Sequence, residues 1–421
     1  MPSLKSCIRK PLLLEFIKRN ARWLLGAFLL ALFSAFGQTF FISLFNDDIR
    51  AHFGLTDGQF GTIYMCATLC SAAVFLKLGS IVDRFSTAIV ASIVLLALAA
   101  ANATMAVCDS VWLLAICLFS LRLFGQGMIL HVSQTAVGKW FDAERGRAIA
   151  LTSMGLNFGE SIFPLLIGTV TIWISWRYCW AAAAVSAVLA IPVCHWLTKV
   201  PRTPKLRDKE TQAVVAVRNW TRKEVLGDKL FWLASPAIFS PAFIATAIYF
   251  HHQHLVGIKS WPDGSFAPGF ILLSIATVAA KFCAGSLIDR FGAIRLLWTY
   301  HLPLGLACVL LGLGQNAWFI YLAMTLIGIA MGFANSIFGT VWPELYGTKH
   351  LGAIRSVAVS GVVFASACGT GVTGWLIDWK IGFESQLVFM ALWCLCSAGT
   401  LFMVSRLMLR RIQADAQALE Y

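Results

Sequence analysis

Three ionisable residues, Arg122, Glu160 and Lys281, stand inside long apolar stretches of the 421-residue sequence. A charge in the middle of a lipid bilayer costs about 2.5–3.5 kcal/mol on insertion scales, so such a residue normally faces a partner or a water-filled cavity. Arg122 and Glu160 have opposite signs and comparable depths, and they could form a pair. Lys281 would then be the unpaired cation, and a carboxylate would be its natural partner. If that pair forms, the residue types favour an anion as the partner of Lys281.

Polar side chains extend this candidate site along the same helical faces. Gln126 follows Arg122 by four positions, and Asn157 precedes Glu160 by three. Residues three or four apart share one face of a helix. Gln38, in the first apolar stretch, is a further candidate. We therefore expect the substrate to be bound by Arg122, Gln126, Asn157, Glu160, Lys281 and Gln38.

Each of these charges also has a purely structural interpretation. A bridge between Arg122 and Glu160 would hold two adjacent helices together without contacting the substrate. Lys281 lies four residues before Gly285, near the expected end of its apolar run. Its ammonium group could therefore reach the membrane surface over about 6 Å. If transport is coupled to protons, Glu160 is the candidate carrier, because burial and a neighbouring arginine both tune the pKa of a carboxyl group.

Histidines at positions 251, 252 and 254 form a second concentration of ionisable side chains. His251 and His254 are about one helical turn apart and could share a ligand. No carboxylate or cysteine accompanies them at the spacing of metal ligands, so no metal site is predicted. A gate, a proton-sensitive hydrogen bond and simple packing are the alternatives. We assign His251 and His254 to a gate at the outer end of their helix.

The composition indicates that lipid surrounds these side chains. Hydrophobic residues make up 59% of the chain and charged residues only 13%, whereas soluble proteins have about 45–50% and about 25%. So little charge excludes an ordinary cytosolic enzyme, a disordered chain and a nucleic-acid-binding domain. The sequence has no P-loop, and we expect neither an enzymatic activity nor a cofactor.

Twelve apolar runs are long enough to cross a bilayer, which takes roughly 20 residues. They lie near 23–46, 58–79, 86–107, 110–137, 147–170, 174–197, 229–255, 265–286, 293–313, 316–341, 352–376 and 384–406. The sequence therefore predicts an all-α membrane protein with twelve transmembrane helices in two six-helix bundles. The expected segments are an N-terminal segment at 1–22, bundles at 23–197 and 229–406, a central loop at 198–228 and a tail at 407–421.

Basic residues are concentrated in the N-terminal segment, the central loop and the tail, with Lys18, Arg202 and Arg410 among them. The loops that alternate with these carry few. The positive-inside rule therefore places both termini and the central loop in the cytoplasm. This arrangement accounts for most of the net charge of +13 without a nucleic-acid partner. We expect a multi-pass protein of a bacterial-type inner (plasma) membrane that acts as a monomer.

The two halves repeat one another at an offset of 206 residues. The sequence GSIVDRF at 79–85 recurs as GSLIDRF at 285–291, and DGQF at 57–60 recurs as DGSF at 263–266. Eight identities in eleven positions at one offset indicate a duplication. Two parallel halves related by an axis along the membrane normal place a binding site near the midplane between them.

The three buried charges are absent from this repeat. At the same offset, Gly328 replaces Arg122, Ser366 replaces Glu160 and Phe75 replaces Lys281. The duplicated scaffold therefore does not require these charges. Their asymmetry indicates a role in substrate binding or in coupling.

The repeated G-x-x-x-D-R pattern, formed by Gly79, Asp83 and Arg84 and again by Gly285, Asp289 and Arg290, resembles the signature of the major facilitator superfamily. The resemblance implies the twelve-helix fold of that family and transport by alternating access. It also implies a gate, because this segment joins two helices on the cytoplasmic face. Glycine permits close backbone approach, and an aspartate at a helix end can pair with arginine or with an opposing helix dipole. A solvated turn is the alternative interpretation.

A narrower resemblance covers two segments. RLFGQG at 122–127 and GKWFDAERGRA at 138–148, followed by Gly155, are similar to the helix 4–5 region of monocarboxylate porters and oxalate/formate exchangers. In those relatives a basic residue on helix 8 binds the substrate carboxylate, which implies this role for Lys281. The first apolar run departs from those porters, because it carries the neutral Gln38 and Thr39 and no lysine.

We therefore expect a secondary active transporter that moves a small organic anion, with a carboxylate as the first choice and protons as a candidate coupling ion. The alternative is a proton-coupled exporter of drugs or other amphipathic compounds, in which Glu160 is the counter-ion of a cation. The stretch G-x-x-x-G-P that is typical of drug/proton antiporters is only partly matched at 155–160, where Glu160 takes the place of proline. A membrane sensor would need a signalling domain, and none is visible.

Overall fold

The computed structural model describes residues 13–79, 81–141, 145–171, 173–200, 202, 219–347 and 350–419. Most of the expected N-terminal segment and central loop, and the last two residues of the tail, lie outside these ranges. Within them, twelve helices are long and apolar enough to cross a membrane. The prediction of an all-α protein with twelve transmembrane helices is confirmed.

The N-terminal bundle consists of residues up to Thr198. Its helices are α1 (Leu13–Phe33), η1 (Ser34–Gly37), α2 (Thr39–Ile42), η2 (Ser43–Phe45), α3 (Asn46–Phe53), α4 (Asp57–Leu78), α5 (Ile81–Arg84), α6 (Thr87–Ala106), α7 (Val111–Ser120), the π-helix η3 (Leu121–Ile129), α8 (Leu130–Trp140), α9 (Arg145–Val170) and α10 (Trp176–Thr198).

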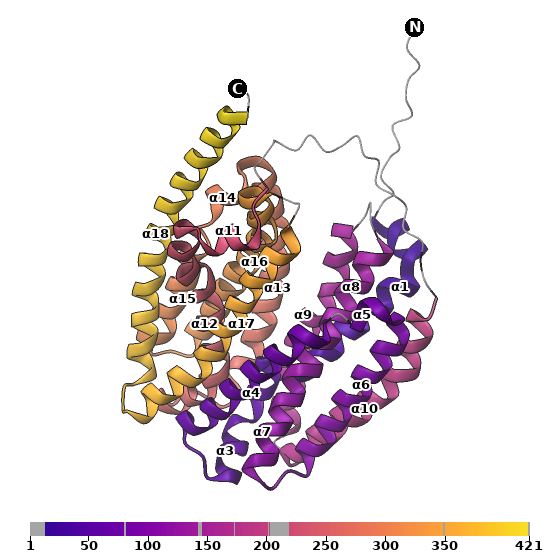
Figure 1. Ribbon diagram of the computed structural model, residues 1–421. Helices are drawn as coiled ribbons and strands as arrows, with labels where there is room; N and C mark the ends of the chain where they lie inside the picture. Colours follow the sequence, from indigo (N-terminus) through magenta and orange to yellow (C-terminus); the bar gives the residue numbers. More distant parts are fainter. Residues whose placement is uncertain are drawn as a thin grey trace.

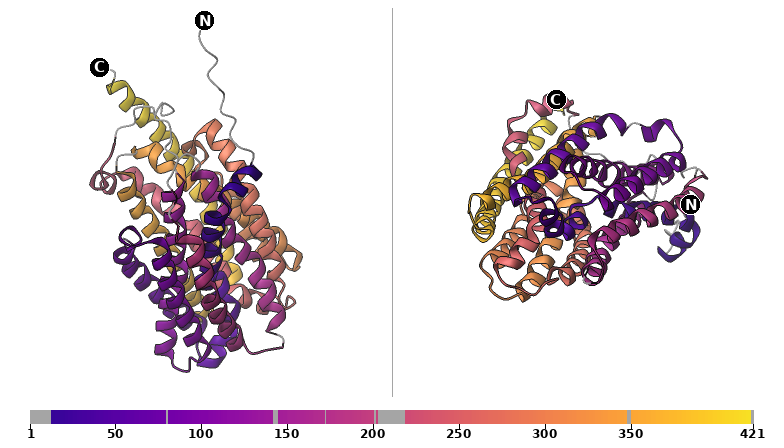
Figure 2. Two further views of the ribbon diagram at one scale, coloured as in Figure 1. Left: turned by 90° about the vertical axis from the view of Figure 1, so that its right-hand side faces the viewer. Right: turned by 90° about the horizontal axis from the view of Figure 1, so that it is seen from below.

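The C-terminal bundle begins after the central loop. Its helices are α11 (Arg222–Leu226), α12 (Lys229–Ile258), α13 (Phe266–Phe291), α14 (Ala293–Leu296), α15 (His301–Leu313), α16 (Trp318–Tyr346), α17 (Leu351–Asp378) and α18 (Phe383–Leu419). Figures 1 and 2 show the two bundles side by side, with the start of α1 and the end of α18 at the same face of the molecule. We call this face the terminal face and the opposite one the distal face.

The bundles meet mainly where α4 packs against α17 and α9 packs against α13. Small residues permit the α4–α17 crossing: a Cβ at Gly61 would lie 2.6 Å from the carbonyl oxygen of Thr370, and one at Gly374 would lie 2.5 Å from that of Asp57. Close packing of this kind is how helices associate in lipid, where the hydrophobic effect between them is absent.

The bundles are joined near the distal face and separate toward the terminal face (Figure 1). Every hydrogen bond or ion pair between described residues of different bundles lies in the distal part. One example is Thr56 Oγ1 donating to Asp378 Oδ2 at 2.6 Å, and another is Trp375 Nε1 donating to Thr62 Oγ1 at 2.6 Å. The structure therefore shows a conformation that is closed at the distal face.

Several helices extend beyond the apolar runs that predicted them. Helix α1 begins at Leu13 rather than near 23, and α18 continues to Leu419 rather than ending near 406. The expected boundaries at 22 and 406 are therefore wrong as helix ends. Hydropathy locates the part of a helix that lies in hydrocarbon, but the backbone hydrogen bonds continue through polar residues at the interface. Arg22, in α1, donates to the carbonyl oxygen of Leu197 at 3.1 Å and so ties this extension to α10.

Candidate functional site

The first transmembrane helix is interrupted in the middle of the bundle. Helix α1 ends at Phe33 and continues as η1 to Gly37. Gln38 is then extended (φ −83°, ψ 153°), and α2 begins at Thr39. Such a break frees backbone carbonyl groups, which are tolerated within a membrane only where other groups satisfy them. Gly37 is required here because a Cβ would lie 2.6 Å from the Cα of Gly125 in η3. Broken helices of this kind form the substrate and ion sites of many transporters.

Arg122 satisfies the freed groups. Its Nη1 donates to the carbonyl oxygen of Gly37 at 3.1 Å and to Thr39 Oγ1 at 3.3 Å, and its Nε donates to Thr68 Oγ1 at 3.2 Å. The guanidinium group also lies over the ring of Tyr64, 5.2 Å from its centre. Arg122 is only 1% exposed, and its Nη2 has no hydrogen-bond partner. One donor of a buried cation is thus left free.

The expected ion pair between Arg122 and Glu160 is not formed. Among the described residues, Arg122 has no carboxylate oxygen within 4.0 Å. The reason is the break in helix 1, which offers the guanidinium group a carbonyl oxygen and a hydroxyl group inside the N-terminal bundle. Glu160 instead lies where α9 meets α13.

Glu160 is brought close to Lys281, which belongs to the other bundle. The two side chains are near enough for their charges to interact, although they form no ion pair within 4.0 Å. Ser274 lies beside the Glu160 carboxyl group, and its buried hydroxyl oxygen has no formed hydrogen bond. Tyr249, from α12, is also close enough to feel the charge of Glu160. A carboxyl group, an amine and two hydroxyl groups therefore meet at the boundary between the bundles.

Lys281 lies on α13, which ends at Phe291 rather than near 286. The helix extends past its apolar run through the exposed Asp289 and Arg290, so the later helix end does not change the distance from Lys281 to the membrane surface. Lys281 is half-buried, and its charge interacts with that of Glu160 in the other bundle. Its substrate-binding and structural interpretations both stay predictions.

The other candidates fall into two places. Asn157 is on α9, three residues before Glu160, and its buried Nδ2 has no hydrogen-bond partner. Gln38 and Gln126 are half-buried beside the break in helix 1, Gln126 within the π-helix. π-Helical turns are rare and occur frequently at functional sites. The structure thus gathers Arg122, Gln38 and Gln126 around one centre, and Glu160, Asn157 and Lys281 around another.

Sequence reasoning missed the hydroxyl groups that surround the charges. Thr39, Tyr64 and Thr68 hold Arg122, and the hydroxyl of Tyr64 also donates to Thr39 Oγ1 at 2.9 Å. Tyr64 and Thr68 are four residues apart in an apolar run and therefore share a face. Ser274 and Lys281 are seven residues apart and share a face for the same reason. This spacing could have identified the hydroxyl groups from the sequence.

A second cluster of charges closes the distal face. Asp57, at the start of α4, lies 3.6 Å from Nδ1 of His251 and 3.5 Å from Nδ1 of His254, both on α12. Arg50 Nη2 lies 2.8 Å from the same carboxyl group. One carboxylate of the N-terminal bundle thus holds two histidines of the C-terminal bundle. This geometry is consistent with the gate that we expected at His251 and His254.

Hydrogen bonds around this cluster extend the contact between the bundles. Asn46 Nδ2 donates to the carbonyl oxygen of Phe250, and Gln253 Nε2 donates to that of Leu44 at 3.0 Å. The backbone N–H of Asp47 donates to Gln253 Oε1 at 3.3 Å. Burial raises the pKa of Asp47 above its ordinary value, while the charge of Arg50 opposes this rise. The distal contact is therefore polar and can be broken and re-formed.

The signature residues of the expected second gate lie near the terminal face. His131 lies 3.2 Å from the carbonyl oxygen of Gly79 through Nε2, and Arg84 is exposed. The side chain of Asp83 lies outside the described part of the chain. In the C-terminal bundle, α13 continues through Gly285, where a Cβ would meet no atom within 4 Å. Asp289 and Arg290 are both exposed. The described members of the two signatures do not contact each other in this conformation.

The described residues contain no group of three or more histidine, cysteine, aspartate or glutamate side chains that could hold a metal ion. The three histidines at 251, 252 and 254 therefore do not form such a group.

Known proteins resemble this chain over most of its length in fold and over shorter stretches in sequence. A bacterial homolog of the human lysosomal transporter Spinster, solved in an inward-facing and unoccupied conformation, has a TM-score of 0.72 at 14% identity, covering 93% of this chain and 98% of that one. A D-xylose-proton symporter has a TM-score of 0.67 at 15% identity, covering 92% of this chain and 97% of that one.

Among curated relatives, the multidrug resistance protein MdtG of Escherichia coli is 29% identical over 160 residues, which are 36% of this chain and 37% of that protein. The riboflavin transporter MCH5 of Saccharomyces cerevisiae is 20% identical over 302 residues, which are 67% of this chain and 58% of that protein. The chain thus spans less than two thirds of the length of either relative.

The family profile described as Major Facilitator Superfamily matches residues 27–273 and 265–416, which together include Arg122, Glu160 and Lys281 and most of both bundles. The chain belongs to the major facilitator superfamily.

Proposed function

We propose that this transporter moves a small organic anion, with a carboxylate as the first choice, by alternating access between its two bundles. The observation that carries the proposal is the balance of charge in the middle of the spans, where two cations, Arg122 and Lys281, are opposed by the single carboxyl group of Glu160. A net positive centre in low dielectric favours an anion. The Nη2 of Arg122 has no partner and could donate a hydrogen bond to a substrate carboxylate.

Lys281 and Glu160 belong to different bundles, so their separation changes when the bundles rock. A substrate carboxylate that binds Lys281 competes with Glu160 for the same ammonium group. Displaced from its cation, a buried Glu160 is stabilised by taking up a proton. Substrate binding and proton binding are therefore linked at one place, which supports coupling to protons. The resemblance of helices 4 and 5 to monocarboxylate porters is the second support for symport.

The orientation follows from the basic residues. Both termini and the central loop are proposed to lie in the cytoplasm of a cell with a bacterial-type inner membrane. The distally closed conformation would then be the inward-facing one. We propose that a monomer carries out transport and that uptake is its direction.

Counterflow in proteoliposomes tests the proposal. Radiolabelled mono- and dicarboxylates are supplied to the wild type, to Lys281→Met and to Arg122→Lys, with Lys229→Met as the matched control because Lys229 is exposed at the start of α12. We expect loss of carboxylate exchange in Lys281→Met and Arg122→Lys, with Lys229→Met unchanged. Unaltered exchange in both central variants would refute the anion site.

The similarity to MdtG favours a second candidate, a proton-coupled exporter of drugs or other amphipathic compounds. In that case Glu160 is the counter-ion of a cationic substrate. Glu160→Gln alone would then abolish drug resistance in cells, whereas Lys281→Met would not. The same two variants therefore separate the two functions, because the anion proposal requires the lysine.

A further inference from the structure

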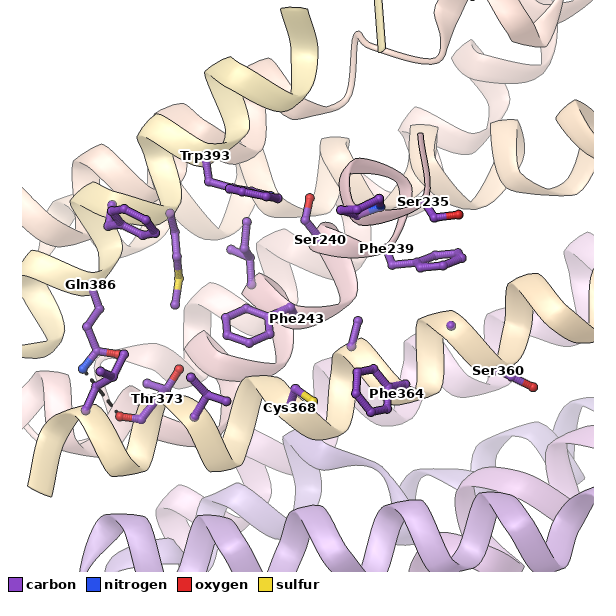
Figure 3. Close-up of a pocket in the computed structure, with 18 of the residues that line it drawn as sticks. Ser235, Phe239, Ser240, Phe243, Ser360, Phe364, Cys368, Thr373, Gln386 and Trp393 are labelled. Atoms are coloured by element: carbon purple, nitrogen blue, oxygen red, sulfur yellow. Dashed lines mark hydrogen bonds between the residues drawn. The ribbon is translucent and has the colours of Figure 1, made fainter. Parts of the chain in front are cut away.

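A cavity of about 980 Å³ opens on the outside of the C-terminal bundle, between α12, α17 and α18 (Figure 3). Aromatic side chains form much of its wall, including Phe239, Phe243, Phe364, Phe389 and Trp393. Phe364 is 59% exposed and Phe389 68% exposed, so the cavity opens away from the protein. All three helices are long and apolar enough to span the membrane. Lipid therefore surrounds the opening, and none of the described residues of the N-terminal bundle lines the cavity.

Three of the four serine hydroxyl groups that line the cavity are already satisfied. Ser235 donates to the carbonyl oxygen of Phe231, Ser240 to that of Ala237 and Ser360 to that of Ser356, each within its own helix. These three hydroxyl groups need no ligand. The fourth, Ser385, is exposed next to Gln386.

Gln386 and Thr373 differ from these serines. They lie together at one end of the cavity (Figure 3), with exposed fractions of 4% and 0%. Gln386 Nε2 donates to the carbonyl oxygens of Ile381 at 2.9 Å and Thr373 at 3.5 Å, which fixes the orientation of the amide. Its Oε1 is then left without a donor, and Thr373 Oγ1 also has no partner. Unsatisfied polar groups are strongly unfavourable in hydrocarbon.

This polar end lies close to the distal ends of its two helices. Thr373 is five residues before the end of α17, and Gln386 is three residues after the start of α18. Both are thus within about 8 Å of the distal helix ends. From there the apolar wall runs along α17 as far as Val357, about 24 Å toward the terminal face. The cavity therefore has the shape and polarity of an amphiphile that is inserted from the distal leaflet.

We propose that this cavity binds a membrane lipid of the distal leaflet. Its acyl chain lies against the aromatic wall, and an N–H or O–H group of its head donates a hydrogen bond to Gln386 Oε1. Thr373 contributes a hydroxyl group to the same head group. The unpaired acceptor requires a donor, so lipids with an ammonium or hydroxyl head group fit the site, and lipids with a quaternary ammonium group do not. This site is separate from the proposed transport site and does not depend on it.

Photo-crosslinking in nanodiscs tests the proposal with the full chain. The probes are phosphatidylethanolamine, phosphatidylglycerol and phosphatidylcholine, each with the same diazirine-bearing acyl chain, and peptide mass spectrometry locates the products. We expect labelling of α12, α17 and α18 around the cavity by the first two probes. Their labelling should exceed that by phosphatidylcholine roughly three- to tenfold, the factor that one hydrogen bond typically contributes.

Two variants separate the head-group contact from the chain contact. Gln386→Leu should remove the preference for donor head groups while chain labelling persists. Ala365→Trp fills the cavity from its wall and should reduce labelling by every probe. Leu392→Trp is the matched control, because Leu392 is 56% exposed on α18 and does not line the cavity. Size-exclusion profiles and thermal midpoints check that each variant is folded.

Three outcomes would overturn the proposal. They are equal labelling by all three lipids in the wild type, a preference that survives in Gln386→Leu, and cavity labelling that Ala365→Trp leaves at the level of Leu392→Trp.

Discussion

His251 faces Asp57 across the boundary between the bundles, and both of its ring nitrogens are directed at acceptors. Its Nδ1 lies 3.6 Å from Asp57 Oδ1, and its Nε2 lies 3.1 Å from the carbonyl oxygen of Thr370. The ring thus lies between a carboxyl oxygen of the N-terminal bundle and a carbonyl oxygen of its own bundle, and it holds the start of α4 next to α12 and α17 in the closed distal face.

Loss of the His251 contact should therefore weaken closure of the distal face. His254, also on α12, lies 3.5 Å from the same carboxyl group and so keeps part of the contact. Arg50 contacts Asp57 as well, but both belong to the N-terminal bundle, so this pair does not hold the two bundles together. Distances between spin labels at the distal ends of α4 and α12 report the degree of closure.

His251→Gln tests the assignment of this contact to one residue. Glutamine keeps a donor for the carbonyl oxygen of Thr370 but has no second nitrogen to present to Asp57. We expect the distance distribution to shift toward longer distances. His52→Gln is the control, because His52 lies near the distal face but contacts Asp109 within the N-terminal bundle. An unchanged distance distribution in His251→Gln would contradict this account.

Replacement of Arg122 should disturb the break in helix 1. Arg122→Met leaves the buried carbonyl oxygen of Gly37 without its side-chain donor, which costs about 1–3 kcal/mol in the free energy of unfolding. Arg122→Lys keeps the charge but cannot reproduce the separate bonds to Gly37 and Thr68. We expect a lower thermal midpoint for both variants, with the larger drop in Arg122→Met. Equal midpoints for the variants and the wild type would mean that the bonds seen here contribute nothing to stability.

Glu160 and Lys281 should be energetically coupled. Lys281→Met leaves a buried carboxyl group without its nearby cation, and adding Glu160→Gln removes that carboxyl group's charge. The double variant should therefore be more stable than the sum of the two single effects by about 0.5–3 kcal/mol, the usual range for interacting neighbours. Thermal unfolding of the four proteins in one detergent gives this comparison. Additive effects would show that the two charges do not interact.

A larger side chain at the α4–α17 crossing should prevent distal closure. In Gly61→Val, the Cβ would approach the carbonyl oxygen of Thr370 to 2.6 Å, so the helices must separate. Gly168→Val is the matched control, because a Cβ at Gly168 meets no atom within 4 Å. We expect Gly61→Val to stop transport and to increase labelling of a cysteine introduced at Thr62. Wild-type transport by Gly61→Val would show that the crossing tolerates a wider separation.

The sequence alone was sufficient to predict those parts of the fold that depend only on the residues within one helix or one repeat. Twelve apolar runs and the repeat of 79–85 at 285–291 predicted the helices, the two bundles and the family. Hydropathy is additive along a chain, so it places the membrane-embedded part of each helix. It does not place helix ends, because backbone hydrogen bonding continues into polar residues. This is why α13 extends to Phe291 although its apolar run ends near 286.

The residues that carry buried charge were also visible in the sequence, because an arginine or a carboxyl group in an apolar run is rare. Their partners were decided by tertiary structure. Arg122 binds the break at Gly37 rather than Glu160, and Glu160 lies close to Lys281 of the other bundle. A side chain pairs with whatever group lies within a few ångströms, and that depends on how separate helices cross. Spacing along one helix holds no information about the helix that packs against it.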